Sequence, residues 1–100
     1  KTISLELRQQ VLNRYSGQWS EENCQFPAIW QINGSKLVED WPGIGKIELN
    51  VLTVAEQGIT VKVTSPKKYQ DKIYQYQLAD TNIVIVEKST GQSEKLIRCG

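Results

Sequence analysis

Histidine and methionine are both absent from this chain of 100 residues, and cysteine occurs only twice. Histidine is the usual general base near neutral pH, and it orients the nucleophile in most hydrolytic sites. A zinc site ordinarily takes three or four Cys or His ligands, more than this chain offers. We therefore expect a protein that is not an enzyme and that uses no cofactor and no metal.

Carboxylates are the remaining candidates for acid–base chemistry, and two pairs are adjacent in sequence, Glu21/Glu22 and Glu39/Asp40. Adjacent residues of a strand point to opposite faces, so neither pair is expected to converge on one reacting bond. A pair from distant segments, such as Glu48 with Glu87, stays open as an alternative.

Charge of one sign and long apolar runs are also missing. Twelve Lys and Arg residues balance 11 Asp and Glu residues, which gives a formal net charge of +1. This balance provides no electrostatic case for nucleic acid as a partner. No apolar run approaches the ~20 residues of a membrane helix, so no membrane span is expected. The chain starts at Lys1 and has no methionine, and we interpret it as a mature chain after signal-peptide removal or as a trimmed part of a longer protein.

The two cysteines, Cys24 and Cys99, lie far apart in the sequence. A lone distant pair in a small domain predicts one structural disulfide, whereas redox pairs are usually close together, as in Cys-x-x-Cys. The alternatives are a redox switch or a metal site. The disulfide indicates an exported protein, secreted or periplasmic. The length predicts a single domain over residues 1–100.

Residues 1–17 are predicted to be an N-terminal helical segment. Ile3, Leu7, Val11 and Tyr15 recur every four residues, a spacing that places them on one face of a helix over Leu5–Ser16. Ser4 is a suitable N-cap, and the following glycine is a suitable C-terminal stop.

Residues 18–100 predict an antiparallel β-domain. Its hairpin signal is Asn33-Gly34, where both residues tolerate positive φ. In one long strand the apolar phase shifts at Leu52, which predicts a bulge or a strand buried on both faces. Residues 65–71 are predicted to be a loop. The fold class is mainly β, a helix followed by a seven- or eight-stranded meander that closes into a small barrel, with a β-sandwich as the alternative. The expected strands are Gln18–Glu21, Ala28–Ile32, Lys36–Trp41, Lys46–Ala55, Ile59–Thr64, Lys72–Leu78, Ile83–Lys88 and Ser93–Arg98.

Aromatic and basic side chains supply the candidates for partner or ligand binding. Trp41 ends a strand beside a proline and is expected at an exposed rim, and Trp30 is a second candidate. Lys67, Lys68 and Tyr69 form a basic and aromatic cluster in the predicted loop. The alternatives are that the tryptophans fill the core and that the lysines are simply solvated.

The segment Tyr15-Ser16-Gly17-Gln18-Trp19 follows the expected helix and resembles the Gly-x-Trp entry of lipocalin-like (calycin) barrels. In that superfamily the tryptophan begins the first strand and plugs the closed end, and an arginine near the last strand packs across it. The resemblance implies this packing role for Arg98 and a small barrel that binds small apolar ligands.

Two non-catalytic functions follow from these features. The first is a small exported module that binds or inhibits another protein. The alternative is a lipocalin-like carrier of a small hydrophobic ligand.

Overall fold

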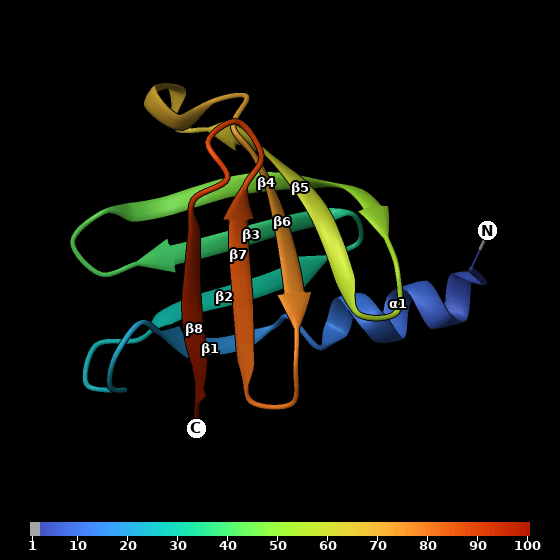
Figure 1. Ribbon diagram of the computed structural model, residues 1–100, viewed down its shortest axis with the longest axis horizontal. Coiled ribbons are helices and arrows are strands. Elements are labelled where there is room, and N and C mark those ends of the chain that lie inside the picture. The colour runs from blue at the N-terminus through green and yellow to red at the C-terminus, as the bar shows by residue number, and fades with distance from the viewer. Residues whose placement is uncertain (1–2) are drawn as a thin grey trace.

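The computed structural model describes residues 3–100, as one helix followed by an antiparallel β-barrel (Figure 1). Each strand pairs with the next, and β8 pairs with β1, so the barrel is closed. The predicted small barrel is therefore confirmed, and the sandwich alternative is wrong. Within the described residues no helix is both long enough and apolar enough to cross a membrane. The elements are α1 (Leu5–Asn13), β1 (Gly17–Ser20), β2 (Ala28–Asn33), β3 (Lys36–Trp41), β4 (Gly45–Val54), β5 (Gly58–Ser65), the 3-10 helix η1 (Lys67–Tyr69), β6 (Ile73–Leu78), β7 (Asn82–Glu87) and β8 (Ser93–Cys99).

The helix begins where the sequence predicts, since the Ser4 hydroxyl accepts a hydrogen bond from the amide of Leu7 at 3.1 Å. It ends at Asn13 rather than at Ser16. The amides of Tyr15 and Ser16 donate to carbonyls three residues earlier, so the chain tightens into a turn before β1 starts. The helix lies at one end of the barrel, beside the β4–β5 turn (Figure 1).

The bulge predicted at the phase shift of β4 is confirmed. The pairing with β5 runs from Val51↔Val61 to Thr53↔Thr60, which leaves Leu52 without a partner and 48% exposed. One extra residue in one strand re-aims the side chains beyond it and increases the local twist, which helps a short sheet to close.

Two turns differ in detail from the sequence-based expectation. Asn33 is the last residue of β2 and pairs with Lys36, so the hairpin turn consists of Gly34 and Ser35, with only the glycine at positive φ (+63°). A glycine at the first central position satisfies the turn by itself. The loop predicted over residues 65–71 contains η1, in which the amide of Tyr69 donates to the carbonyl of Pro66 at 3.0 Å.

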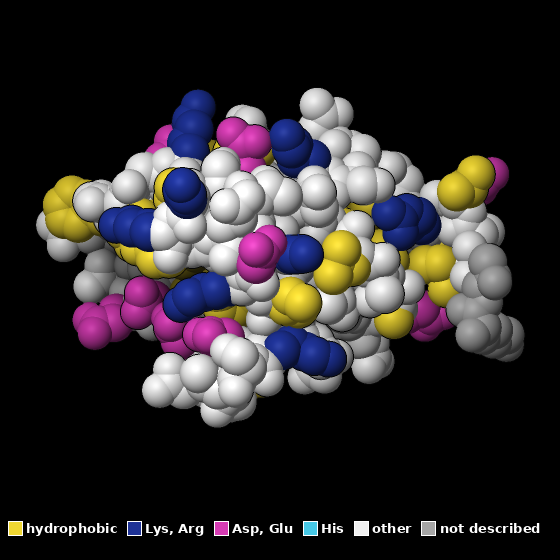
Figure 2. Space-filling model, turned by 90° about the horizontal axis from the view of Figure 1, so that it is seen from above, with side chains coloured by type: hydrophobic (Ala, Val, Ile, Leu, Met, Phe, Trp, Pro, Cys, Tyr) yellow, Lys and Arg dark blue, Asp and Glu magenta, His cyan; other side chains and the backbone are white. Residues whose placement is uncertain are grey.

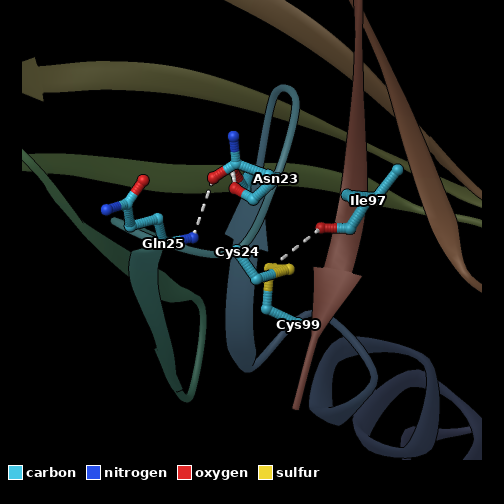
Figure 3. Close-up of a disulfide and its surroundings, with 6 residues drawn as sticks. Asn23, Cys24, Gln25, Ile97 and Cys99 are labelled. Atoms are coloured by element: carbon cyan, nitrogen blue, oxygen red, sulfur yellow. Dashed lines mark hydrogen bonds between the residues drawn. A yellow bond between two sulfur atoms is a disulfide. The ribbon is translucent and has the colours of Figure 1, made fainter.

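The predicted disulfide between Cys24 and Cys99 is present, with the two Cα atoms 5.6 Å apart (Figure 3). Cys99 ends β8 opposite Gln18 of β1, and Cys24 lies in the β1–β2 loop. In that loop the Asn23 side-chain oxygen accepts the amide of Gln25 at 3.0 Å. The bond thus fastens the loop to the seam where the first and last strands close the barrel.

Candidate functional site

The helical end of the barrel is closed by a stacked pair from β1 and β8. The guanidinium carbon of Arg98 lies 4.2 Å from the centroid of the Trp19 ring, and Trp19 is fully buried. The Trp19 indole also donates to the carbonyl of Tyr15 at 3.1 Å. Arg98 donates to the carbonyls of Ser16 and Arg14, which ties the last strand to the chain that leaves the helix. The packing that the Gly-x-Trp resemblance implies is thus found in the structure.

Gly17 is a requirement of this arrangement. Its φ is +138°, and a Cβ at this position would lie 2.8 Å from the Nη1 atom of Arg98. A side chain here would therefore be strained and would push the guanidinium away from the indole. This explains why a glycine stands two residues before the plugging tryptophan.

Aromatic rings continue from this plug along the barrel interior. The ring centroids of Trp19 and Trp30 are 5.8 Å apart, and Trp30 stacks on Tyr76 at 5.2 Å. Trp41 meets Trp30 edge-on at 6.1 Å, and Tyr74 follows Tyr76 at 6.3 Å. The column leads from the closed end to the opposite end, where the rings line a cavity.

That cavity, called the mouth cavity below, has a volume of about 240 Å³. It lies at the end of the barrel formed by the β1–β2, β3–β4, β5–β6 and β7–β8 connections. Its walls combine aliphatic side chains, four aromatic rings and three carboxylates. The lining residues are Glu21, Glu39, Trp41, Ile44, Ile47, Leu49, Val63, Tyr69, Tyr74, Tyr76, Ile85 and Glu94.

Glu39 is the most unusual of these residues, because it is charged by type but only 3% exposed. It points inward from β3, between Leu37 and Trp41 in the alternation, whereas Asp40 points outward and is exposed. The Trp41 indole donates to its Oε1 at 2.8 Å, and the Tyr76 hydroxyl donates to its Oε2 at 2.6 Å. A buried carboxyl with one donor on each oxygen is fixed in position.

Burial raises the pKa of the Glu39 carboxyl from 4.5 to about 7, while the hydrogen bonds from Tyr76 and Trp41 lower it by less. Burial also raises the pKa of the Tyr76 hydroxyl well above 10, and the nearby charge of Glu39 adds to this increase. Tyr76 therefore stays a donor at physiological pH, and Glu39 changes charge close to neutrality. Among residues 3–100 there is no group of three Cys, Asp or Glu side chains arranged to hold a metal ion.

A larger hollow, about 810 Å³, is an external groove between α1 and the β4–β5 and β6–β7 turns. Apolar and charged side chains both line it, among them Leu7, Val11, Leu78, Arg14 and Asp80. The groove runs over the outside of the barrel at the closed end and shares no residue with the mouth cavity.

The structure brings some of the predicted binding residues together and separates others. Trp41 and Tyr69 both line the mouth cavity. Trp41 is half-buried, since it packs on Trp30 as well as lining the cavity. Trp30 is only 1% exposed, so it belongs to the core and not to a binding surface. Lys67 and Lys68 are exposed on η1, where the Lys68 ammonium lies 5.0 Å from the Tyr69 ring.

Sequence reasoning missed Glu39, Tyr74, Tyr76 and Glu94 as residues of one site. A signal for Glu39 was present in the alternation of its strand, where it stands two residues after Leu37 and two before Trp41. Residues two apart on a strand share a face, so a glutamate between two inward-facing apolar residues must itself point inward. No signal in the sequence indicated that β6 would deliver a tyrosine hydroxyl to that carboxylate.

The surface shows no field of a single sign on the face seen in Figure 2, where basic and acidic side chains are interspersed. Comparisons of the chain with protein-family models, with curated proteins and with solved structures found no match. The lipocalin-like interpretation therefore depends on the barrel, on the Gly17-x-Trp19 entry and on the stacked Arg98.

Proposed function

We propose that this protein is an exported, lipocalin-like carrier that binds one small ligand in the mouth of its barrel, without catalysis. The observation that carries the proposal is that the two ends of the barrel interior differ. One end is filled by Trp19 and the helix, and the other keeps a cavity of about 240 Å³. Ligand sites in small barrels occupy such mouths and combine apolar walls with a few polar groups.

The disulfide supports export, because such bonds persist in oxidising compartments. The cavity supports a carrier rather than a filled barrel, because it opens at the mouth of the barrel between apolar, aromatic and a few polar side chains. A water molecule's share of liquid volume is roughly 30 Å³, so the cavity corresponds to about eight waters and suits a ligand on the order of ten non-hydrogen atoms.

Binding is tested with three small probes of similar shape: 2-phenylethanol, 2-phenylethylamine and 3-phenylpropionate. We expect saturable one-to-one binding of at least one probe, seen by tryptophan fluorescence because Trp41 lines the cavity. Ile85→Trp fills the cavity and should abolish binding. Val86→Trp, on the opposite face of β7, is the matched control and should bind as the wild type does. No binding of any probe at millimolar concentration, or equal binding by the Ile85→Trp variant, would exclude the carrier.

Protein binding remains the second candidate, because Phe26 and Ile44 are 72% and 55% exposed on neighbouring loops. Both residues line one shallow hollow beside Trp41. An apolar rim of this kind is typical of an interaction surface. Affinity capture from native extract tests this candidate: a protein held by the wild type should be lost with Phe26→Ser, and equal capture by both would contradict it.

A further inference from the structure

The charge and the ring content of the mouth cavity point to a class of ligand. Three carboxylates, from Glu21, Glu39 and Glu94, line it, and within residues 3–100 no Lys or Arg side chain does. Four aromatic rings line the same space. A ligand that enters therefore meets negative charge and aromatic side chains.

Glu39 has acceptor capacity that the protein leaves unused. Each of its oxygens accepts one hydrogen bond, whereas a carboxylate offers about four acceptor positions. No Lys or Arg nitrogen of the described residues lies within 4 Å of it. Buried carboxylates are ordinarily paired with a cation, because removing an isolated charge from water costs several kcal/mol. Among the described residues, Glu39 thus has no cation as a partner.

We infer that the ligand is a small organic ammonium ion, whose charged nitrogen pairs with Glu39 among the rings of Trp41, Tyr74 and Tyr76. This inference depends on the proposed carrier function. Cations are attracted to aromatic faces by the ring quadrupole, and tryptophan and tyrosine are favourable partners. The aliphatic wall of Ile47 and Ile85 is available for the apolar body of the ligand.

The arrangement selects against other charges. An anionic ligand would approach three carboxylates, and no basic side chain of residues 3–100 lines the wall to receive it. A neutral ligand could fill the space but would leave ionised Glu39 without a counter-ion. The hydrogen bonds from Trp41 and Tyr76 keep the carboxylate in place before the ligand arrives, so little ordering is needed on binding.

The experiment compares 2-phenylethylamine, which is an ammonium ion below pH 9, with 2-phenylethanol and 3-phenylpropionate by calorimetric titration at pH 8. We expect the amine to bind at least about tenfold more tightly than the alcohol, and the carboxylate to bind least. In Glu39→Gln this preference should disappear, while binding of the alcohol is retained. Asp40→Asn, which removes the neighbouring carboxylate on the outer face of β3, is the matched control and should keep the preference.

Lowering the pH gives an independent measurement. Protonation of Glu39 below pH 7 removes the charge that pairs with the amine, so affinity for the amine should fall about tenfold from pH 8 to pH 5, toward the affinity for the alcohol. Affinity for the alcohol should change little, and Glu39→Gln should remove most of the dependence. The other ionisable groups that line the cavity are Glu21, Tyr69, Tyr74, Tyr76 and Glu94.

The outcomes separate this inference from the carrier function. If the alcohol binds as tightly as the amine at pH 8, the ammonium preference is overturned and the carrier stands. If the preference survives in Glu39→Gln, this residue is not the pairing group and the inference is also overturned. If no probe binds, the carrier itself fails, and the inference fails with it.

Discussion

Glu39 should make this protein less stable as the pH rises toward neutrality, the opposite of the usual behaviour of a carboxyl group. Its pKa is 4.5 when unfolded and about 7 when folded, so the folded state holds the proton more tightly. The contribution of protonated Glu39 to the free energy of unfolding is fully present below pH 4.5 and is lost as the pH rises through 7. The difference between the two pKa values corresponds to a loss of about 3 kcal/mol, at about 1.36 kcal/mol per pH unit.

Glu39→Gln isolates this contribution, because glutamine keeps the size and stays neutral at every pH. Its amide oxygen can accept the Trp41 indole, and its amide nitrogen can donate to the hydroxyl oxygen of Tyr76. The variant should therefore resemble the protonated wild type. We expect the free energy of unfolding of the variant, minus that of the wild type, to increase by about 3 kcal/mol between pH 4.5 and pH 8.

Urea denaturation followed by tryptophan emission, at steps of pH without any ligand, measures both free energies. Taking the difference between two proteins cancels the titration of the carboxyls they share. Asp40→Asn serves as the control, since it removes an exposed carboxyl from the outer face of the same strand. A flat difference for Glu39→Gln, or one that decreases with pH, would refute the reasoning that burial controls this group.

Two further predictions concern the closed end and the covalent link. Gly17→Ala should lower the free energy of unfolding by about 1–3 kcal/mol, because a Cβ would lie 2.8 Å from the guanidinium of Arg98. The same variant should show a weaker near-ultraviolet circular dichroism signal from Trp19. An unchanged spectrum and an unchanged stability would contradict this prediction. Replacing Cys24 and Cys99 together by serine opens a loop whose ends are 75 residues apart in sequence. On the chain-entropy model this should lower the free energy of unfolding by about 4.5 kcal/mol, measured as a shift of the urea midpoint. An unchanged midpoint would show that the disulfide adds no stability to a barrel that is already closed.

Most of the fold could be predicted because its signals are local. Alternation and turn residues gave strand positions to within one or two residues, and the phase shift at Leu52 located a bulge. The helix was predicted three residues too long, because apolar spacing continues to Tyr15 while the backbone has already turned at Arg14. Tyr15 is buried through this turn rather than through a further helical turn.

The site could be predicted only in part, because its residues are brought together by the closure of the barrel. Trp41 and Tyr69 stood out as aromatic residues near breaks in the strands, and both line the cavity. Trp30 and Trp41 look alike in sequence, since both lie on strands with alternating burial. Their separation into core and cavity wall depends on how far each lies from the plug formed by Trp19, a distance that is set when β1 pairs with β2.

The charge on Glu39 should have opposite effects on the stability of the empty barrel and on the binding of an ammonium ligand. The charge that makes the empty barrel less stable above pH 7 is the charge that an ammonium ligand would neutralise, so such a ligand should stabilise the protein more at pH 8 than at pH 5. A carboxylate retained only to hold two rings would behave differently, because its hydrogen bonds with Trp41 and Tyr76 are equally available to a glutamine. The pH dependence of ligand-induced stabilisation therefore distinguishes a binding group from a structural one within the same buried position.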